Sequence, residues 1–230
     1  MKIGVNIGHI GTQGAVGFLY ETQCNTEIVT ALIPMLKKAG HTVIDCSIPA
    51  KNGIEDYIMS TNYANTQSLD LLISVHCNSF SDPNANGTEV LYTGNGKGKE
   101  YAGQLSKRIS EKLGTFNRSG KADNKTHIII RTICPCVLIE SFFVSNKNDC
   151  LKYDPQKIAE AIAENFGYTK GENNMFKDVP ETHYAYKHIK KLKDYGIVNG
   201  DEKGNYNPDE KITRADVAII VANALTICGK

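Results

Sequence analysis

The 230-residue sequence has no long apolar run and almost no excess of charge of one sign. Its apolar runs fall well short of the roughly 18 residues that a membrane-spanning helix needs. Lysine and arginine number 26 against 25 acidic residues, which leaves a net charge of +1. We therefore expect no membrane partner and no nucleic-acid partner, since both would favour a strongly basic surface. Met1 leads directly into a short apolar run that is unlike the core of a secretory signal, so we expect no signal peptide.

The seven cysteines have neither the even number nor the regular spacing of a disulfide framework, so we expect reduced thiols. Cys134 and Cys136 are separated by one residue, whereas redox and zinc motifs usually have two between their cysteines. We interpret this pair as small buried side chains beside a strand.

The first 168 residues alternate short β-branched runs with longer amphipathic segments. This alternation predicts an α/β fold, with a twisted, mostly parallel or mixed sheet and helices on both faces. Expected strands cover residues 2–8, 42–47, 69–76, 88–92, 127–131 and 136–140, and expected helices cover 20–39, 53–67, 98–113 and 155–165.

The composition changes at residues 169–174, six polar residues that we interpret as a linker. Residues 175–230 then predict a small helical unit, with helices at about 184–195 and from Thr213 onward. Asp216 follows Thr213 by three residues, as in a variant of the capping box. A unit of about 55 residues buries little surface, so we expect it to pack on the main domain, on copies of itself or on a partner.

Three expected strands end in side chains that can bind a metal or move a proton, namely His9, His76 and Glu140. If these strands are parallel neighbours, the three side chains meet at the carboxyl edge of the sheet, where open α/β sheets place their sites. A catalytic zinc takes three protein ligands and keeps one position open, and two histidines with a glutamate are one known ligand set. The sequence therefore predicts a metal site that contains His9 and His76.

Glu21 and Glu27 are the candidates for the third ligand, because both lie near the start of the first expected helix. Six helical residues correspond to about 600°, so only one of them can point at the site, and we choose Glu21 in the first turn. Glu140 stands among apolar neighbours, which raises a carboxyl pKa and suits proton transfer near neutral pH. Taken singly, each residue also has a structural interpretation, such as a buried core histidine or a glutamate that favours a helix start.

Residues 6–9, 20–25, 73–78 and 137–143 resemble the zinc-dependent N-acetylmuramoyl-L-alanine amidases found in clostridial phage endolysins and bacterial autolysins. The resemblance covers about residues 1–168, with the four motifs in family order. It implies that His9, Glu21 and His76 bind one Zn²⁺ and that Glu140 is the catalytic glutamate. It also implies hydrolysis of the amide between N-acetylmuramic acid and L-alanine in peptidoglycan.

Several other residues are candidates for substrate contacts. Lys121, Lys125 and Arg131 could meet peptide carboxylates, although solvated loop charges are an alternative explanation. Asn78 follows His76 by two residues and either orients that ligand or serves as a turn residue. We interpret His41 as structural, and His127 likewise. The loops expected to wall the substrate groove cover residues 10–19, 79–87 and 115–125.

Residues 176–180, 183–186, 196–200, 206–208 and 212–216 resemble the S-layer homology (SLH) motif, which spans 175–228 here. The resemblance implies attachment to pyruvylated secondary cell-wall polysaccharide. Arg214 and Asp216 are the candidate binding residues, since a guanidinium at a helix N-terminus suits a small anion. The sequence departs from the motif at Asp216, where glutamate is usual, and in having one copy where three are usual. Self-association through this unit would restore the usual arrangement, so we predict an oligomer.

Taken together, these resemblances imply an enzyme that lyses the wall of a Gram-positive, clostridial-type host. The expected lack of a signal peptide favours a phage endolysin, made in the host cytoplasm and released to the wall through a holin-type hole. A host autolysin or sporulation amidase is an alternative. Two alternatives of other classes are a zinc peptidase that cuts within the stem peptide and a wall-binding protein with an inactive catalytic domain.

Overall fold

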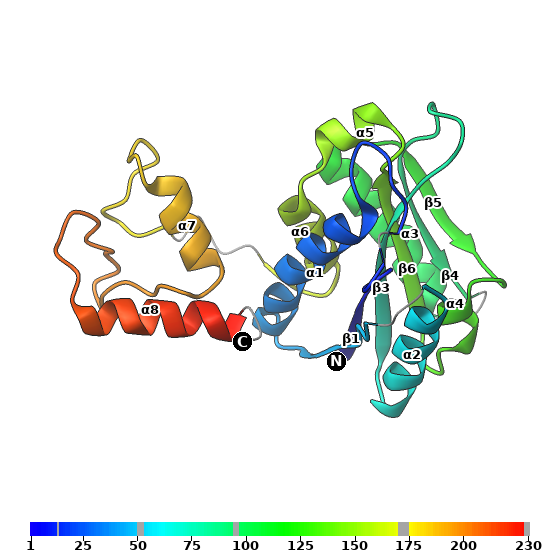
Figure 1. Cartoon of the computed structure of the whole chain (residues 1–230), viewed down its shortest axis with the longest axis horizontal. Helices are drawn as coiled ribbons and strands as arrows, with labels where there is room; N and C mark the ends of the chain where they lie inside the picture. Colours follow the sequence, from blue (N-terminus) through cyan, green and yellow to red (C-terminus); the bar gives the residue numbers. More distant parts are fainter. Residues whose placement is uncertain (13, 50–52, 94–96, 170–174, 228–230) are drawn as a thin grey trace. The chain divides into compact units, whose positions relative to one another are not determined.

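The computed structural model describes the chain except residues 13, 50–52, 94–96, 170–174 and 228–230 (Figure 1). The chain forms two compact units, Met1–Thr169 and Lys170–Lys230. Apart from Thr169, the expected linker lies outside the described residues. The first unit contains, in chain order, β1 (Lys2–Ile7), α1 (Glu21–Lys38), β2 (Thr42–Asp45), α2 (Gly53–Thr66), β3 (Leu71–Asn78), β4 (Thr88–Tyr92), α3 (Lys97–Leu113), β5 (Asn117–Ala122), α4 (His127–Arg131), β6 (Cys136–Phe143), α5 (Lys147–Lys152) and α6 (Pro155–Asn165).

The described strands of the first unit form one sheet in the order β2-β1-β3-β6-β4-β5. Neighbouring strands are parallel except β4 and β6, which pair antiparallel. The predicted α/β fold with a mixed sheet is therefore confirmed. In particular, β1, β3 and β6 are adjacent and parallel, so their carboxyl ends share one edge.

Helices cover both faces of the sheet because the buried strands carry apolar side chains on both sides (Figure 1). In β3, Ile73 and Val75 belong to the larger core, which α1, α3 and α6 complete. Leu72 lies on the other face, in a smaller cluster with residues of α2 and α4. Alternate residues of β3 thus belong to different cores, as the period of a strand requires.

The expected strand at residues 127–131 is wrong, because these residues form the short helix α4. Ile128 and Ile129 are buried while Ile130 is 43% exposed, which is a pattern that a single helical turn produces. Asp123 accepts hydrogen bonds from the backbone N–H groups of Lys125 and Thr126 just before the helix and starts the turn. A short apolar run by itself does not distinguish a strand from a helix.

Residues 115–125 were expected as a loop, but they contain the edge strand β5. Its sequence is polar and mostly exposed, and therefore lacks the apolar alternation that marks a half-buried strand. The short helix α5 was also missed, although Asn146 caps it by accepting a hydrogen bond from the N–H of Asp149. Strands β3 and β6 run past their expected ends at residues 76 and 140.

The second unit contains α7 (Tyr186–Asp194) and α8 (Arg214–Ile227). Its small core consists of Phe176, Val179, Ile189 and Val198. The predicted capping box is confirmed, since Thr213 Oγ1 accepts from the N–H of Asp216 at 3.1 Å and donates to its carboxylate at 2.6 Å. Few side chains of α8 pack inward, and the exposed ones include Val217, Ile219, Val221, Leu225 and Ile227.

The described cysteines, at positions 24, 46, 77, 134, 136 and 150, are all free thiols, as expected. Cys136 is buried in the smaller core and Cys134 packs against it. Within the described residues, none of the helices is both long and apolar enough to span a membrane.

Candidate metal centre and catalytic residue

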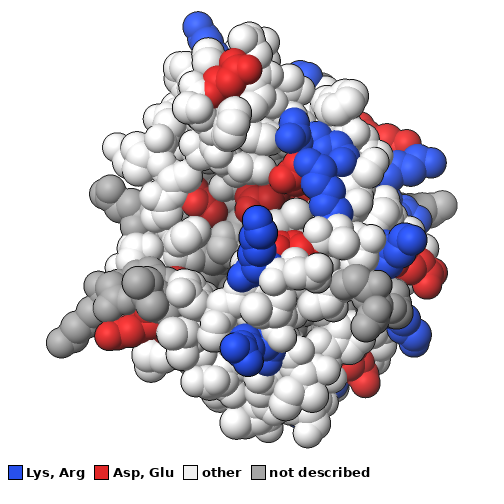
Figure 2. All heavy atoms as spheres, turned by 90° about the vertical axis from the view of Figure 1, so that its right-hand side faces the viewer, with Lys and Arg blue, Asp and Glu red and all other residues white. Residues whose placement is uncertain are grey.

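The carboxyl edge of β1, β3 and β6 brings together the side chains that the sequence singled out. His9 lies two residues after β1, while His76 is part of β3 and pairs in register with Glu140 of β6. In Figure 2, which faces the side of the first unit that carries α2, acidic side chains lie in a hollow and basic side chains border it.

The loop after β1 fixes the backbone of His9. His9 has a φ of 61°, a left-handed conformation that is costly for a residue with a side chain. Its carbonyl oxygen accepts hydrogen bonds from the N–H of Thr12 at 2.9 Å and from the hydroxyls of Thr12 and Thr22 at 3.1 and 3.3 Å. These contacts stabilise the strained backbone of His9 and so fix the position of its imidazole.

Glu21, the first residue of α1, has a carboxylate between the two imidazoles. Its Oε1 lies 3.5 Å from Nε2 of His9 and 3.1 Å from Nδ1 of His76. Its Oε2 accepts a hydrogen bond from the N–H of Ala15 at 2.7 Å. Glu27 has other partners, accepting from Tyr153 Oη at 2.8 Å and from Gln23 Nε2 at 3.0 Å.

The three groups can provide one ligand atom each within 4.8 Å of one another, among the described residues. Tetrahedral zinc with bonds of about 2.0–2.1 Å separates its ligand atoms by about 3.3 Å, close to the two distances from Glu21. The donor set of two imidazoles and one carboxylate also fits zinc. The structure therefore contains a site suited to a divalent cation.

The protonation states support the same interpretation. Burial lowers the pKa of His9, which favours the neutral imidazole that binds metals. Burial would raise the pKa of Glu21, but the hydrogen bond and charge of His76, the charge of His9 and the N–H of Ala15 together outweigh burial and lower the pKa. Burial would lower the pKa of His76, but its hydrogen bond to Glu21 and the nearby carboxylate charges together outweigh burial and raise the pKa. A cation can replace the proton that His76 and Glu21 would otherwise share.

Polar side chains inside the buried strands support His76. Ser74 Oγ lies 3.1 Å from Nε2 of His76 and donates a hydrogen bond to Asn6 Oδ1 at 2.8 Å. These bonds leave Nδ1 of His76 directed toward Glu21. Sequence analysis missed Ser74 and Asn6, although polar residues within apolar strands were a signal that could have found them. Gly8 leaves room for the imidazole, since a Cβ there would lie 2.2 Å from the ring.

Glu140 has the properties of a proton acceptor. Its Oε2 is buried and has no hydrogen-bond partner among the described residues. Burial raises the pKa of Glu140 to about 7, and the negative charges of Glu21 and Glu89 add to this effect while His76 opposes it. A buried carboxylate oxygen without a partner is costly, which is typical of functional sites.

The loop that leads to Glu21 is tied to the end of β6. The N–H of Phe18 donates to the carbonyl oxygen of Val144 at 2.8 Å. A Cβ on Gly17 would lie 2.2 Å from the same oxygen, so only glycine allows this approach. The metal ligands and Glu140 are thus connected through main-chain contacts.

The other predicted binding residues have different surroundings. Asn78 donates to Glu89 Oε1 at 3.2 Å and Lys121 donates to Glu89 Oε2 at 2.6 Å. Arg131 is exposed at the end of α4, and Lys125 is exposed before that helix. In the second unit, Arg214 begins α8, where it and Asp216 are both exposed.

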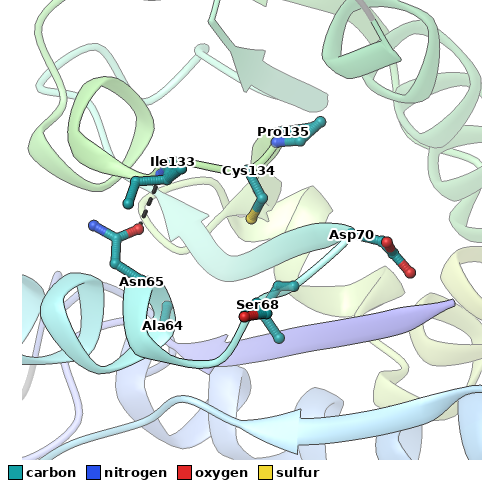
Figure 3. Close-up of a pocket in the computed structure, with 8 residues that line it drawn as sticks. Ala64, Asn65, Ser68, Asp70, Ile133, Cys134 and Pro135 are labelled. Atoms are coloured by element: carbon teal, nitrogen blue, oxygen red, sulfur yellow. Dashed lines mark hydrogen bonds between the residues drawn. The ribbon is translucent and has the colours of Figure 1, made fainter.

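A hollow of about 390 Å³ lies at the opposite, amino edge of the sheet (Figure 3). It is lined by Asn65, Asp70, Ile133 and Cys134 among others, and Asn65 accepts a hydrogen bond from the N–H of Ile133. Asp70 is engaged there with the N–H of Lys2 at 2.7 Å. This hollow is separate from the candidate metal centre.

Residues 3–167 match the family model described as N-acetylmuramoyl-L-alanine amidase. The chain belongs to this family. Residues 176–218 match the S-layer homology domain, so the family assignments predicted from the sequence are confirmed.

Proteins with similar sequences occur in Clostridium and Bacillus species. An uncharacterized protein of Clostridium perfringens is 30% identical over 212 residues, which cover 89% of this chain and 63% of that protein. An uncharacterized cell wall amidase of Bacillus anthracis is 33% identical over 129 residues, which cover 50% of this chain and 24% of that protein. This chain thus spans less than two thirds of the length of these curated relatives.

Solved structures of the amidase family share the fold. The catalytic domain of the CD27L endolysin targeting Clostridia Difficile has a TM-score of 0.65 at 35% identity, with 72% of this chain and 96% of that chain covered. CwlV, an N-acetylmuramoyl-L-alanine amidase from Bacillus (Paenibacillus) polymyxa var. colistinus, has a TM-score of 0.62 at 24% identity, with 71% and 94% covered. The match to CwlV shows the fold alone.

Proposed function

We propose that this chain hydrolyses the amide between N-acetylmuramic acid and L-alanine in peptidoglycan, with His9, Glu21 and His76 holding a zinc ion and Glu140 acting as the general base. The observation that carries the proposal is the convergence of three metal-binding side chains beside a buried, unpaired carboxylate oxygen. Membership of the amidase family supports the bond that is cut. When bound, zinc supplies Lewis-acid chemistry that polarises the scissile carbonyl and acidifies water.

The protein's own residues perform the remaining steps. Glu140 Oε2 takes a proton from the attacking water and returns it to the nitrogen of the leaving L-alanine, so one group acts first as base and then as acid. Glu21 carries the negative charge that balances a cation between the two imidazoles. Ser74 and Asn6 keep the imidazole of His76 in its orientation.

The activity should fall on the acid side of neutrality. Glu140 must be ionised to accept a proton, its metal-free pKa is raised to about 7 by burial, and a bound cation lowers that value. We therefore expect an acid limb in the pH profile, set by a pKa no higher than about 7. Along this limb kcat/KM should decrease about tenfold per pH unit. Zinc content measured at each pH separates this loss from release of the metal. An acid limb that persists unchanged in the Glu140→Gln variant, with zinc retained, would contradict the assignment of Glu140.

Mass spectrometry of digested peptidoglycan tests the proposed bond. Release of intact stem peptides with a free L-alanine amine supports the amidase. Truncated stem peptides would instead identify a zinc peptidase, since the ligand set alone does not choose the amide. Binding to the wall without soluble products would identify an inactive wall-binding protein.

We also propose that the chain is a phage endolysin and acts at the wall of a Gram-positive host. The 35% identity to the catalytic domain of an endolysin supports this origin. A host autolysin or sporulation amidase is the alternative, and expression of the gene during phage lysis or during sporulation distinguishes them.

The second unit is proposed to attach the enzyme to anionic wall polysaccharide and to associate with copies of itself. Arg214 and the N–H groups at the start of α8 that Thr213 does not engage are the proposed anion contacts. The exposed apolar side chains of α8 support self-association, because Val217, Val221 and Leu225 recur every four residues and contiguous apolar surfaces mark interaction sites.

We expect the full chain to sediment as an oligomer and Ile219→Glu to sediment as a monomer. Ile219 is 58% exposed, so the substitution adds a charge to the apolar surface with little effect on the fold. Glu202→Gln, an exposed change outside α8, is the control. A wild-type chain that remains monomeric at high concentration in analytical ultracentrifugation would refute self-association.

A further inference from the structure

A cluster of charged side chains lies beside Glu140 on the neighbouring strands β4 and β5. Glu89 of β4 pairs in register with Glu140, which itself pairs with His76 of β3. Side chains paired in register project from the same face of a sheet. His76, Glu140 and Glu89 therefore form a row across three strands, and Glu89 is one strand spacing, about 4.8 Å, beyond Glu140.

Glu89 holds two basic side chains at the open side of this row. Its Oε2 accepts a hydrogen bond from Nε of Arg118 at 2.6 Å and another from Nζ of Lys121 at 2.6 Å. Its Oε1 accepts from Asn78 at 3.2 Å. The Glu89 side chain is 11% exposed, whereas those of Arg118 and Lys121 are 31% and 44% exposed. The carboxylate is thus mostly covered and the cations reach solvent.

The cluster has more positive charge and more donors than Glu89 can satisfy. Two cations share one carboxylate, which leaves a net charge of +1. Arg118 also donates from Nη1 to the carbonyl oxygen of Asn86 at 3.3 Å and lies 5.1 Å from the ring of Phe143. Within the described chain, the other terminal nitrogen of Arg118 makes no hydrogen bond, and Lys121 uses one of its three donors. The free donors suit an anion.

The distance between the cluster and the metal centre indicates which anionic group of the substrate can reach the cluster. Two strand spacings separate β3 from β4, so the cluster is about 10 Å from His76. An extended peptide advances about 3.3–3.6 Å per residue, so a chain that starts at the metal centre reaches the cluster within about three residues. Peptidoglycan stem peptides carry a glutamate-derived residue directly after L-alanine, and its carboxyl group falls in this range.

We propose that Arg118 and Lys121, positioned by Glu89, bind a free carboxylate on the residue that follows L-alanine in the leaving peptide. This inference rests on the proposed amidase function and adds a substrate preference to it. Stem peptides whose carboxyl group is amidated are poorer substrates, because the neutral amide offers no negative charge to the pair.

Two synthetic muramoyl tripeptides test the inference, one with a free α-carboxylate on the second residue and one with the corresponding amide. For the wild-type holoenzyme we expect kcat/KM to favour the carboxylate by about tenfold to a hundredfold, mostly through KM, as the loss of a charge-assisted hydrogen bond implies. The double variant Arg118→Gln/Lys121→Gln should process both substrates alike. Glu89→Gln should raise KM for the carboxylate substrate more than KM for the amide substrate.

Lys107→Gln is the matched control, because Lys107 lies on α3 in an exposed pair with Glu111, 3.9 Å away. It should keep the wild-type preference. Equal cleavage of both substrates by the wild type, or a preference that persists in the double variant, overturns the inference and leaves the amidase function standing. Failure of the wild type to cleave either substrate removes the proposed function and this inference with it. If the double variant does not fold, the exposed single variant Lys121→Gln replaces it, with a partial loss of preference expected.

Discussion

Replacing Glu140 with glutamine is expected to reduce peptidoglycan hydrolysis by about 10²- to 10⁴-fold, the usual contribution of a general base. Glutamine has nearly the same shape but cannot accept the proton from water. Glu140 is not one of the three groups that could hold the cation, so the variant should retain zinc. Release of stem peptides measures the first effect, and metal analysis of the purified protein measures the second.

The stability of the Glu140→Gln variant provides an additional check. Burial raises the pKa of Glu140 to about 7, so the folded state disfavours its charged form. This penalty is present at a pH above 7 and disappears as the pH falls toward the pKa of the unfolded chain. The metal-free variant should therefore melt at the same or a higher temperature than wild type at pH 8. Glu111→Gln, on the exposed side of α3, is the control.

Substantial lysis by Glu140→Gln would remove this residue from its proposed role.

Removal of the metal is expected to abolish activity and to lower the melting temperature, and added zinc should restore both. A cation that binds only the folded site stabilises it by about 4 kcal/mol when its free concentration is a thousand times its dissociation constant. Without it, the carboxylate of Glu21 and the two imidazoles keep, within the described chain, only their hydrogen bonds to one another, to the main chain and to Ser74. Chelation followed by calorimetry and activity assays measures the effect.

The variants Glu21→Gln and Glu27→Gln test which carboxylate binds the metal. Glu21→Gln should lose zinc and nearly all activity, because its Oε1 contacts both histidines. Glu27→Gln should keep both, since Glu27 contacts Tyr153 and Gln23 instead. A Glu21→Gln protein that binds zinc as tightly as wild type would exclude Glu21 as a ligand.

The sequence predicted the centre of the sheet because its strands are buried on both faces. Strands β1, β3 and β6 appear as short apolar runs that end near His9, His76 and Glu140, and the parallel arrangement carries these residues to one edge. The helical period showed that only one of Glu21 and Glu27 can face the site, and the place of Glu21 in the first turn decided the choice. The structure has Glu21 between the histidines.

The parts that were missed depend on contacts between segments distant in sequence. The strand β5 has no apolar alternation, because it lies at the sheet edge and gains its pairing from β4. The position of Glu89 beside Glu140 follows from the antiparallel register of β4 and β6, which no local pattern specifies. The isoleucine run of α4 fits a strand or a helix equally well until α2 and β6 cover Ile128 and Ile129.

The contact of Gly17 and Phe18 with Val144 has a consequence for how this protein can diverge. The separation between the cation ligands and the base depends there on one glycine and on peptide groups, which every residue type except proline supplies. Surrounding side chains can therefore change with the wall chemistry of different hosts while the reacting groups stay in alignment.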